Sequence, residues 1–231
     1  MLKNIWNDLD KNIRDSVNND KTRNILSESI LLVPTKILYR MYHPKIVPKI
    51  FPSHPKIHFF IGKAHFNSGR LSQAMEALKT SAQLEPENGD VHYYLGMAFE
   101  KILDHEKAIE NFKIARKFSP EIHDVHRRYG ILLFESGKMR RAVEPLRDFI
   151  ILYPDSTRIL NIFSQVLMEE SRFPEAVDAF QRQIELEPEN KDLYIQKAVA
   201  HQNLGELETA MTVLESAIEI EDEDPELFFE A

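Results

Sequence analysis

The stretch HPKIHFFIGKAHFNSGRLSQAMEALKTSAQLEPE, residues 54–87, contains the pattern that decides the fold. Its apolar and aromatic residues recur at steps of three and four, first over 57–64 and then over 71–82. This spacing places each set on one face of a helix. Ser68-Gly69 separates the two sets, and a glycine there can adopt the left-handed conformation that ends a helix. The stretch therefore predicts two helices joined by a tight turn.

The same pattern returns every 34 residues, without insertion or deletion. A fixed period of this length indicates one helix–turn–helix unit copied in tandem. One such hairpin cannot bury its own apolar faces, so it has to stack on the next. The period is marked by five alanines (Ala74, Ala108, Ala142, Ala176, Ala210), by a bulky residue four positions later (Leu78, Phe112, Leu146, Phe180, Leu214) and by Pro86, Pro120, Pro154, Pro188 and, in the fifth place, Asp222.

The first helix of each unit also carries an apolar residue followed by a small one. The pairs are Ile61-Gly62, Leu95-Gly96, Tyr129-Gly130 and Phe163-Ser164, with Lys197-Ala198 as the weakest version. With these positions the chain resembles the tetratricopeptide-repeat family. The resemblance implies an all-α helix–turn–helix solenoid, wound as a right-handed superhelix. Its repeats would be 55–88, 89–122, 123–156, 157–190 and 191–224, after a helical N-terminal segment with a proline-rich strap (1–54) and before a short tail (225–231).

Some positions depart from the repeat pattern. Pro145 falls inside the second helix of repeat three and removes a backbone donor, so we expect a bend there. Lys197 stands where an apolar core residue is expected, which predicts weaker packing in repeat five. Leu103 and Ser171 replace the turn glycine that Gly137 keeps, and so give less favourable turns.

The composition excludes several classes of protein. There is no cysteine, which excludes disulfides, thiol catalysis and thiolate metal sites and suits a reducing cytosol. The net charge of −8 argues against general binding of nucleic acid. The charge is unevenly spread, because residues 1–54 hold nine Lys/Arg and five Asp/Glu. From Ser29 to Met75 the sequence has no acidic residue.

The basic N-terminal stretch has more than one interpretation. Residues 24–42 cannot span a bilayer, because Pro34 ends their longest apolar run. They can cap the exposed edge of the first repeat or act as a partner-binding helix. They can also lie on an anionic membrane surface, so that the protein would be cytoplasmic or peripheral on a membrane. The residues of this membrane or partner segment would be Lys36, Tyr39, Arg40, Tyr42, Lys45 and Lys49.

The sequence shows no catalytic constellation and predicts no cofactor. The chain has nine histidines, but five of them occupy repeating positions: His58, His92 and His126 at position four, and His65 and His201 at position eleven. Periodic placement indicates packing residues, and no acidic residue lies nearby in the chain to orient a metal-bound imidazole. We therefore expect neither a metal site nor an enzyme.

The resemblance implies a concave groove lined by positions 2, 5, 6, 9, 12 and 13 of the first helices. In the first three repeats these positions combine aromatic, apolar and basic side chains, which favours a peptide or helix with apolar anchors. The groove residues predicted there are Phe59, Lys63, Phe66, Tyr93, Tyr94, Met97, Arg127, Arg128, Ile131 and Phe134. Repeats four and five offer Arg158, Asn161, Ile162, Gln165, Met168 and Glu169, then Asp192, Ile195, Gln196, Val199, Gln202 and Asn203.

Two alternatives to an open groove remain. The aromatic side chains can pack between adjacent first helices, or the N-terminal segment can fill the groove. A clamp for the acidic C-termini of heat-shock chaperones is not expected. Such clamps carry particular residue types at the places of Phe59, Lys63, Tyr94, Asp124 and Arg128, and here only Arg128 agrees with them.

The sequence thus predicts a non-enzymatic scaffold or adaptor that binds a protein or peptide in the groove. The alternative is a membrane-peripheral assembly factor anchored by the N-terminal segment; small tetratricopeptide proteins that coat bacterial magnetosome membranes are similar in architecture. After Asp224 only PELFFEA remains, so repeat five has no full capping helix. We therefore expect a homo-oligomer joined through the uncapped C-terminal repeat, or a partner docked on repeats four and five.

Overall fold

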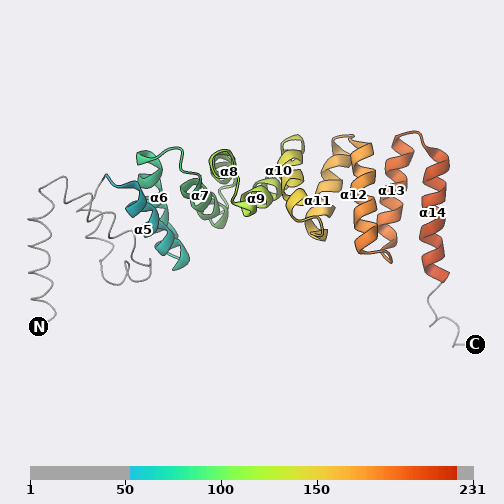
Figure 1. Cartoon of the computed structure of the whole chain (residues 1–231), viewed down its shortest axis with the longest axis horizontal. Helices are drawn as coiled ribbons and strands as arrows, with labels where there is room; N and C mark the ends of the chain where they lie inside the picture. Colours follow the sequence, from blue (N-terminus) through green and yellow to red (C-terminus); the bar gives the residue numbers. More distant parts are fainter. Residues whose placement is uncertain (1–52, 223–231) are drawn as a thin grey trace, which may run out of the picture. The chain divides into compact units, whose positions relative to one another are not determined.

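The computed structural model describes residues 53–222, and within this range the chain forms ten α-helices and no strand (Figure 1). The all-α fold expected from the sequence is confirmed. The helices follow one another as α5 (Pro55–Asn67), α6 (Leu71–Leu84), α7 (Gly89–Lys101), α8 (His105–Phe118), α9 (His123–Glu135), α10 (Met139–Leu152), α11 (Thr157–Glu169), α12 (Phe173–Leu186), α13 (Lys191–Asn203) and α14 (Leu207–Asp222).

Some predictions fall on residues that the structure does not describe. These are the helical N-terminal segment with its strap, the C-terminal tail, and the membrane or partner residues Lys36, Tyr39, Arg40, Tyr42, Lys45 and Lys49. Within 53–222, no helix is both long and apolar enough to cross a membrane.

Each pair of helices is joined by a turn whose central residue has a positive φ. Gly69, Gly137 and Gly205 have φ of 73°, 69° and 79°, and Leu103 and Ser171 adopt the same conformation at 61° and 57°. In each turn the next residue donates its N–H to the carbonyl five residues earlier, at 2.8–3.0 Å. This bond closes the first helix. The two residues that are not glycine accept strain there, because their Cβ crowds the carbonyl oxygen.

Prolines determine where four of the second helices end. Helices α6, α8, α10 and α12 each stop two residues before the repeat proline and are 14 residues long. Helix α14 has Asp222 at that place and continues to it, over 16 residues. The difference follows from proline chemistry, because proline lacks an N–H and disfavours helical geometry in the residue before it.

The core lies between the two helices of each pair and between successive pairs. The five periodic alanines are all buried, four of them fully. Small residues of the first helices allow the second helices to approach closely. A Cβ on Gly96 would lie 2.6 Å from the Phe112 ring, and Gly62 and Gly130 are equally close to the leucines that follow them by 16 residues.

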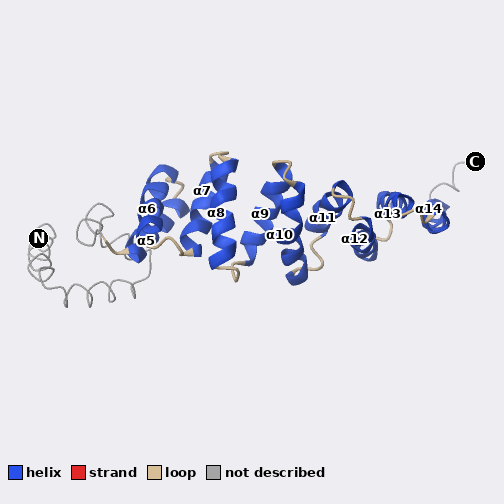
Figure 2. Ribbon diagram, turned by 90° about the horizontal axis from the view of Figure 1, so that it is seen from above, coloured by secondary structure: helices blue, strands red, loops and turns tan. Residues whose placement is uncertain are grey.

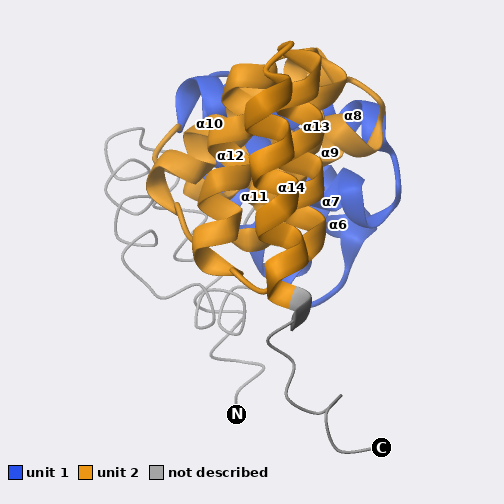
Figure 3. Cartoon of the chain, turned by 90° about the vertical axis from the view of Figure 1, so that its right-hand side faces the viewer, with its two compact units in different colours: residues 1–119 blue, residues 120–231 orange. Residues whose placement is uncertain are grey.

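The chain divides into two compact units, of which the described parts are 53–119 and 120–222 (Figure 3). In unit 1, α5 packs on α6 and α7 packs on α8, while α7 also contacts α5 and α6. In unit 2, each helix from α9 to α14 packs on its neighbour along the chain, and α9 also contacts α11. The units are thus a stack of two helix pairs and a stack of three (Figure 2).

The last pair of unit 2 differs from the others. Leu214 is 40% exposed, whereas Leu78, Phe112, Leu146 and Phe180 at the same repeat position are at most 1% exposed. Lys197 donates from Nζ to Oε1 of Gln181 on α12, at 2.7 Å.

Helix α10 continues through Pro145, whose side chain is buried.

Candidate functional site

Unit 1 brings several of the predicted groove residues into direct contact. Phe59 and Phe66 of α5 both meet Tyr94 of α7 edge to face, with ring centroids 5.7 and 5.6 Å apart. Tyr93 lies 5.7 Å from Tyr94 in the same orientation. Lys63 places its Nζ 5.1 Å from the centre of the Tyr94 ring and 5.8 Å from that of Phe59. We call these five residues the aromatic cluster.

The contacts of the aromatic cluster are internal to unit 1. Its four rings are all partly buried, as is Met97, the sixth predicted groove residue of this unit. Edge-to-face pairs contribute about 0.5–1.5 kcal/mol each beyond burial, and an exposed cation on a ring about 0.5–1 kcal/mol. The contacts of Phe59 and Phe66 with Tyr94 therefore hold α5 against α7.

In unit 2 the four predicted groove residues lie in three different environments. Asp124 accepts from Nε of Arg127 at 2.8 Å and from Nε of Arg128 at 2.5 Å. One carboxylate thus offsets part of the charge of the two guanidinium groups. Ile131 is buried and belongs to the core. Phe134, in contrast, faces an open pocket.

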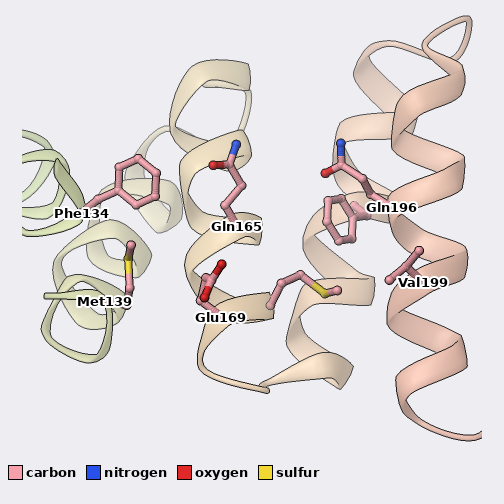
Figure 4. Close-up of a pocket in the computed structure, with 8 residues that line it drawn as sticks. Phe134, Met139, Gln165, Glu169, Gln196 and Val199 are labelled. Atoms are coloured by element: carbon pink, nitrogen blue, oxygen red, sulfur yellow. The ribbon is translucent and has the colours of Figure 1, made fainter. Parts of the chain in front are cut away.

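This pocket of unit 2 has a volume of about 360 Å³ (Figure 4). Phe134 and Met139 lie on one side of it, Gln196 and Val199 lie on the other, and Glu169 lies between them in the view of Figure 4. The complete lining consists of Phe134, Met139, Gln165, Met168, Glu169, Phe180, Gln196 and Val199.

Most residues that line the pocket occupy groove positions of the repeats. Six of the eight lining residues occupy groove positions 6, 9, 12 or 13 of α9, α11 and α13, and only Met139 and Phe180 come from second helices. Phe180 is buried and contributes an apolar side chain to the lining. Met168 stands at position 12, where Phe66 lies in repeat one, and Gln196 stands at position 6, where Tyr94 lies in repeat two. Glu169 is the one ionisable residue of the lining.

The sequence had assigned the six first-helix residues to groove positions but had selected only Phe134. It favoured repeats one to three because of their aromatic and basic residues. The pocket lies at repeats three to five, where the groove positions hold Met168, Val199 and two glutamines. A useful signal would have been the methionine, valine and glutamines at these groove positions, because side chains without rings leave more space between stacked helices.

The five periodic histidines are buried, and His92, His126 and His201 make hydrogen bonds. His92 and His126 each place Nε2 3.0 Å from a proline carbonyl, that of Pro86 and that of Pro120. His65 is buried as well, and burial lowers its pKa below the usual value. Across residues 53–222, no group of three or more His, Asp or Glu side chains is arranged to hold a metal ion.

Comparison with known proteins places the repeats in one family. Models of the tetratricopeptide repeat match residues 61–115, 124–156 and 167–228. No curated protein matches the chain significantly.

Solved structures show the same fold. The structure of MamA AMB-1 is 23% identical, with a TM-score of 0.58, over 75% of this chain and 95% of that one. YrrB, described as a TPR protein with an unusual peptide-binding site, is 18% identical, with a TM-score of 0.61, over 77% and 92% of the two chains. MamA MSR-1 is 21% identical, with a TM-score of 0.54, over 73% of this chain and 97% of that one.

At this level of identity the likeness of these structures to the chain concerns the fold alone. Together with the repeat models and the helix pairs of both units, it shows that the chain is a tetratricopeptide-repeat protein.

Proposed function

We propose that the protein is a non-enzymatic scaffold that binds another polypeptide through the pocket of unit 2. Family membership supports protein interaction as the class of function, and YrrB, a neighbour in fold, is described as having a peptide-binding site. The observation that carries the proposal is the pocket itself, because three successive first helices line it at groove positions.

The size and lining of the pocket indicate what it binds. A volume of about 360 Å³ is at the lower end of the range for ligand sites, and it suits one or two large side chains better than a whole cofactor. Apolar walls favour an apolar anchor, and the two glutamine amides can pair with the backbone of the same polypeptide. Glu169 favours a partner with a cation beside its anchor.

The lining also favours a binding role over catalysis. General acid–base chemistry needs groups that donate and accept a proton, and a covalent mechanism needs a nucleophile beside a base. Of the eight residues that line the pocket, only Glu169 can titrate, and none is a serine, threonine, cysteine, lysine or histidine.

The aromatic cluster of unit 1 is the second surface that we assign to partner binding. Its rings are partly buried against one another, so they offer edges and the Lys63 ammonium to a partner. We expect this surface to add specificity, while the pocket of unit 2 supplies the main anchor.

Binding through the pocket can be tested with peptides selected against the full-length protein. Short random peptides displayed on phage would be selected, and their dissociation constants measured by fluorescence anisotropy. Met168→Lys places a charge in the apolar wall and should weaken binding by at least about tenfold. Ile151→Lys, on an exposed apolar residue of α10, is the matched control and should leave affinity unchanged. Equal affinity for wild type and Met168→Lys would contradict the pocket assignment.

The contribution of the aromatic cluster needs a separate experiment. Proteins captured from extracts of the source organism would be compared for the wild type and for Tyr93→Ala/Tyr94→Ala. Recovery of the same proteins in the same amounts would show that the cluster takes no part in binding.

The membrane-peripheral alternative remains a prediction from the sequence. It depends on residues 24–49, which lie outside the described part of the chain. Sedimentation with anionic liposomes, for the wild type and for Lys36→Glu/Arg40→Glu, would test it. Loss of lipid binding in the variant is expected if the segment is an anchor.

A further inference from the structure

Helix α14 carries a row of exposed apolar side chains along one side. Leu207, Met211, Leu214 and Ile218 are 60, 63, 40 and 62% exposed. Their steps of four, three and four residues keep them on one face of the helix. We call this row the α14 face; within residues 120–222, α14 is the last helix of unit 2 (Figure 2).

The preceding helix pair shows what such a face is shaped to contact. In α12 the same four repeat positions hold Phe173, Val177, Phe180 and Ile184. Phe180 and Ile184 are buried and the other two are partly buried, and α13 packs on this helix. The α14 face therefore corresponds to a surface on which another helix stacks, so its natural occupant is a helix with an apolar side.

Carboxylates border the α14 face. Glu208, Glu215 and Glu219 are exposed and lie about a quarter turn from the apolar row, because each residue advances the helix by about 100°. The helix contains no lysine or arginine. Two α14 faces placed together would bring these carboxylates against one another, which disfavours a symmetric contact. An occupant with cations beside its apolar side is favoured.

The chain itself contains a stretch with this chemistry. Residues 29–49 have no Asp or Glu, and Lys36 and Arg40 are four residues apart in the sequence. The apolar residues next to these cations are Ile37, Leu38 and Met41. This stretch is near the start of the sequence, whereas the α14 face is near its end.

We propose that residues 29–49 of one copy dock on the α14 face of a second copy, so that copies join head to tail. The two surfaces of such a contact are different, so each copy keeps one free surface and longer chains of copies can grow. The α14 face shares no residue with the lining of the pocket of unit 2. Assembly would thus repeat the partner-binding pocket along the chain of copies.

The proposal is tested by sedimentation velocity of the full-length protein over a range of concentrations. At low salt the average mass should rise above that of the monomer with concentration. At high salt it should fall, because salt screens the lysine, arginine and glutamate charges. Met211→Lys/Ile218→Lys on α14, and Lys36→Glu/Arg40→Glu on the basic stretch, should each weaken assembly by about tenfold or more.

Mixing the two variants identifies the two halves of the contact. The α14 variant keeps an intact basic stretch, and the other variant keeps an intact α14 face, so an equal mixture should form one-to-one dimers and nothing longer. Ile151→Lys, at a residue that is 71% exposed on α10, is the control and should assemble like the wild type. Far-ultraviolet circular dichroism would verify that each variant retains its helix content.

Several results would overturn the proposal. These are a wild type that stays monomeric at every concentration, a mixture of the two variants that forms no dimer, and a wild type that binds anionic vesicles through residues 29–49 while remaining monomeric. None of them bears on peptide binding at the pocket of unit 2, which the Met168→Lys experiment tests separately.

Discussion

The two units use the same repeat positions in different ways. In unit 1, groove positions 5, 6 and 12 hold Phe59, Phe66, Tyr93 and Tyr94, whose rings contact one another. In unit 2, groove positions 6, 9, 12 and 13 contribute Phe134, two glutamines, Met168, Glu169 and Val199, and these residues border an open pocket.

This difference shows that aromatic residues at groove positions do not by themselves indicate an open binding site. Large rings at neighbouring positions can reach each other across two stacked helices and stabilise the stack. Shorter or more flexible side chains on the same frame leave a volume that a partner can enter. Changes in unit 1 should therefore act mainly on stability, and changes in the pocket mainly on binding.

The largest effects are expected where the units are alike. Phe112 in unit 1 and Phe180 in unit 2 occupy the same position and are almost completely buried. Phe112→Ala and Phe180→Ala should each lower the free energy of unfolding by about 3–5 kcal/mol. Urea denaturation followed by circular dichroism measures the loss, and hydrogen exchange with mass spectrometry shows which unit opens. A loss below 1 kcal/mol for either variant would contradict the packing described.

The next prediction compares the loss of stability caused by a change in the aromatic cluster with that caused by a change in the pocket. Tyr94→Ala removes three ring contacts and the contact with Lys63, so it should destabilise the protein by about 2–3 kcal/mol. Met168→Ala, at a partly buried pocket residue, should cost about 1 kcal/mol. Both values come from urea midpoints. Equal losses would show that the rings of unit 1 are no more important to packing than the pocket wall.

A smaller effect is expected in the turns, where each unit has one strained residue. Leu103 and Ser171 have positive φ, a conformation that glycine adopts without strain. Leu103→Gly and Ser171→Gly should each stabilise the protein by about 0.5–1 kcal/mol, because relief of strain exceeds the added entropy of the unfolded chain. Gly137→Ala, in the same turn of repeat three, is the reverse control and should destabilise it. Thermal melting would measure all three.

The smallest expected effect is the loss of stability at low pH that arises from His65 in unit 1. Burial is the main cause that lowers the pKa of His65, and Glu76 opposes it in part. The unfolded chain therefore binds a proton more readily, so stability is complete above about pH 6.5 and is lost as the pH falls below that value. His65→Gln should reduce this acid-induced loss, measured by urea denaturation at about pH 7.5 and about pH 5.5. His201→Gln, at the same position of repeat five, should leave the contribution of His65 in place.

Much of the fold could be predicted because the signals that produce it are local. Apolar steps of three and four define the helices, and a turn residue that accepts positive φ separates them. Proline two residues beyond a helix marks its end, and the same rule accounts for the longer α14, where Asp222 replaces the proline. The buried alanines and the small residues opposite Leu78, Phe112 and Leu146 also followed from spacing alone.

The candidate site could be predicted only in part. The resemblance to the family implied which positions of each first helix line a groove, and Phe134, Met168 and Val199 of the pocket were among them. It did not show that the rings of Phe59, Phe66 and Tyr94 pack together, or that Met139 and Phe180 of second helices complete the pocket.

The sequence by itself determined the helix pairs, their turns and the faces that are apolar, because these follow from the spacing of residues within one 34-residue repeat. Only the tertiary structure decided where space remains and which apolar side chains stay exposed. Those properties depend on the volumes of side chains that meet from different repeats, as at the pocket between α9, α11 and α13 and at the uncovered face of α14.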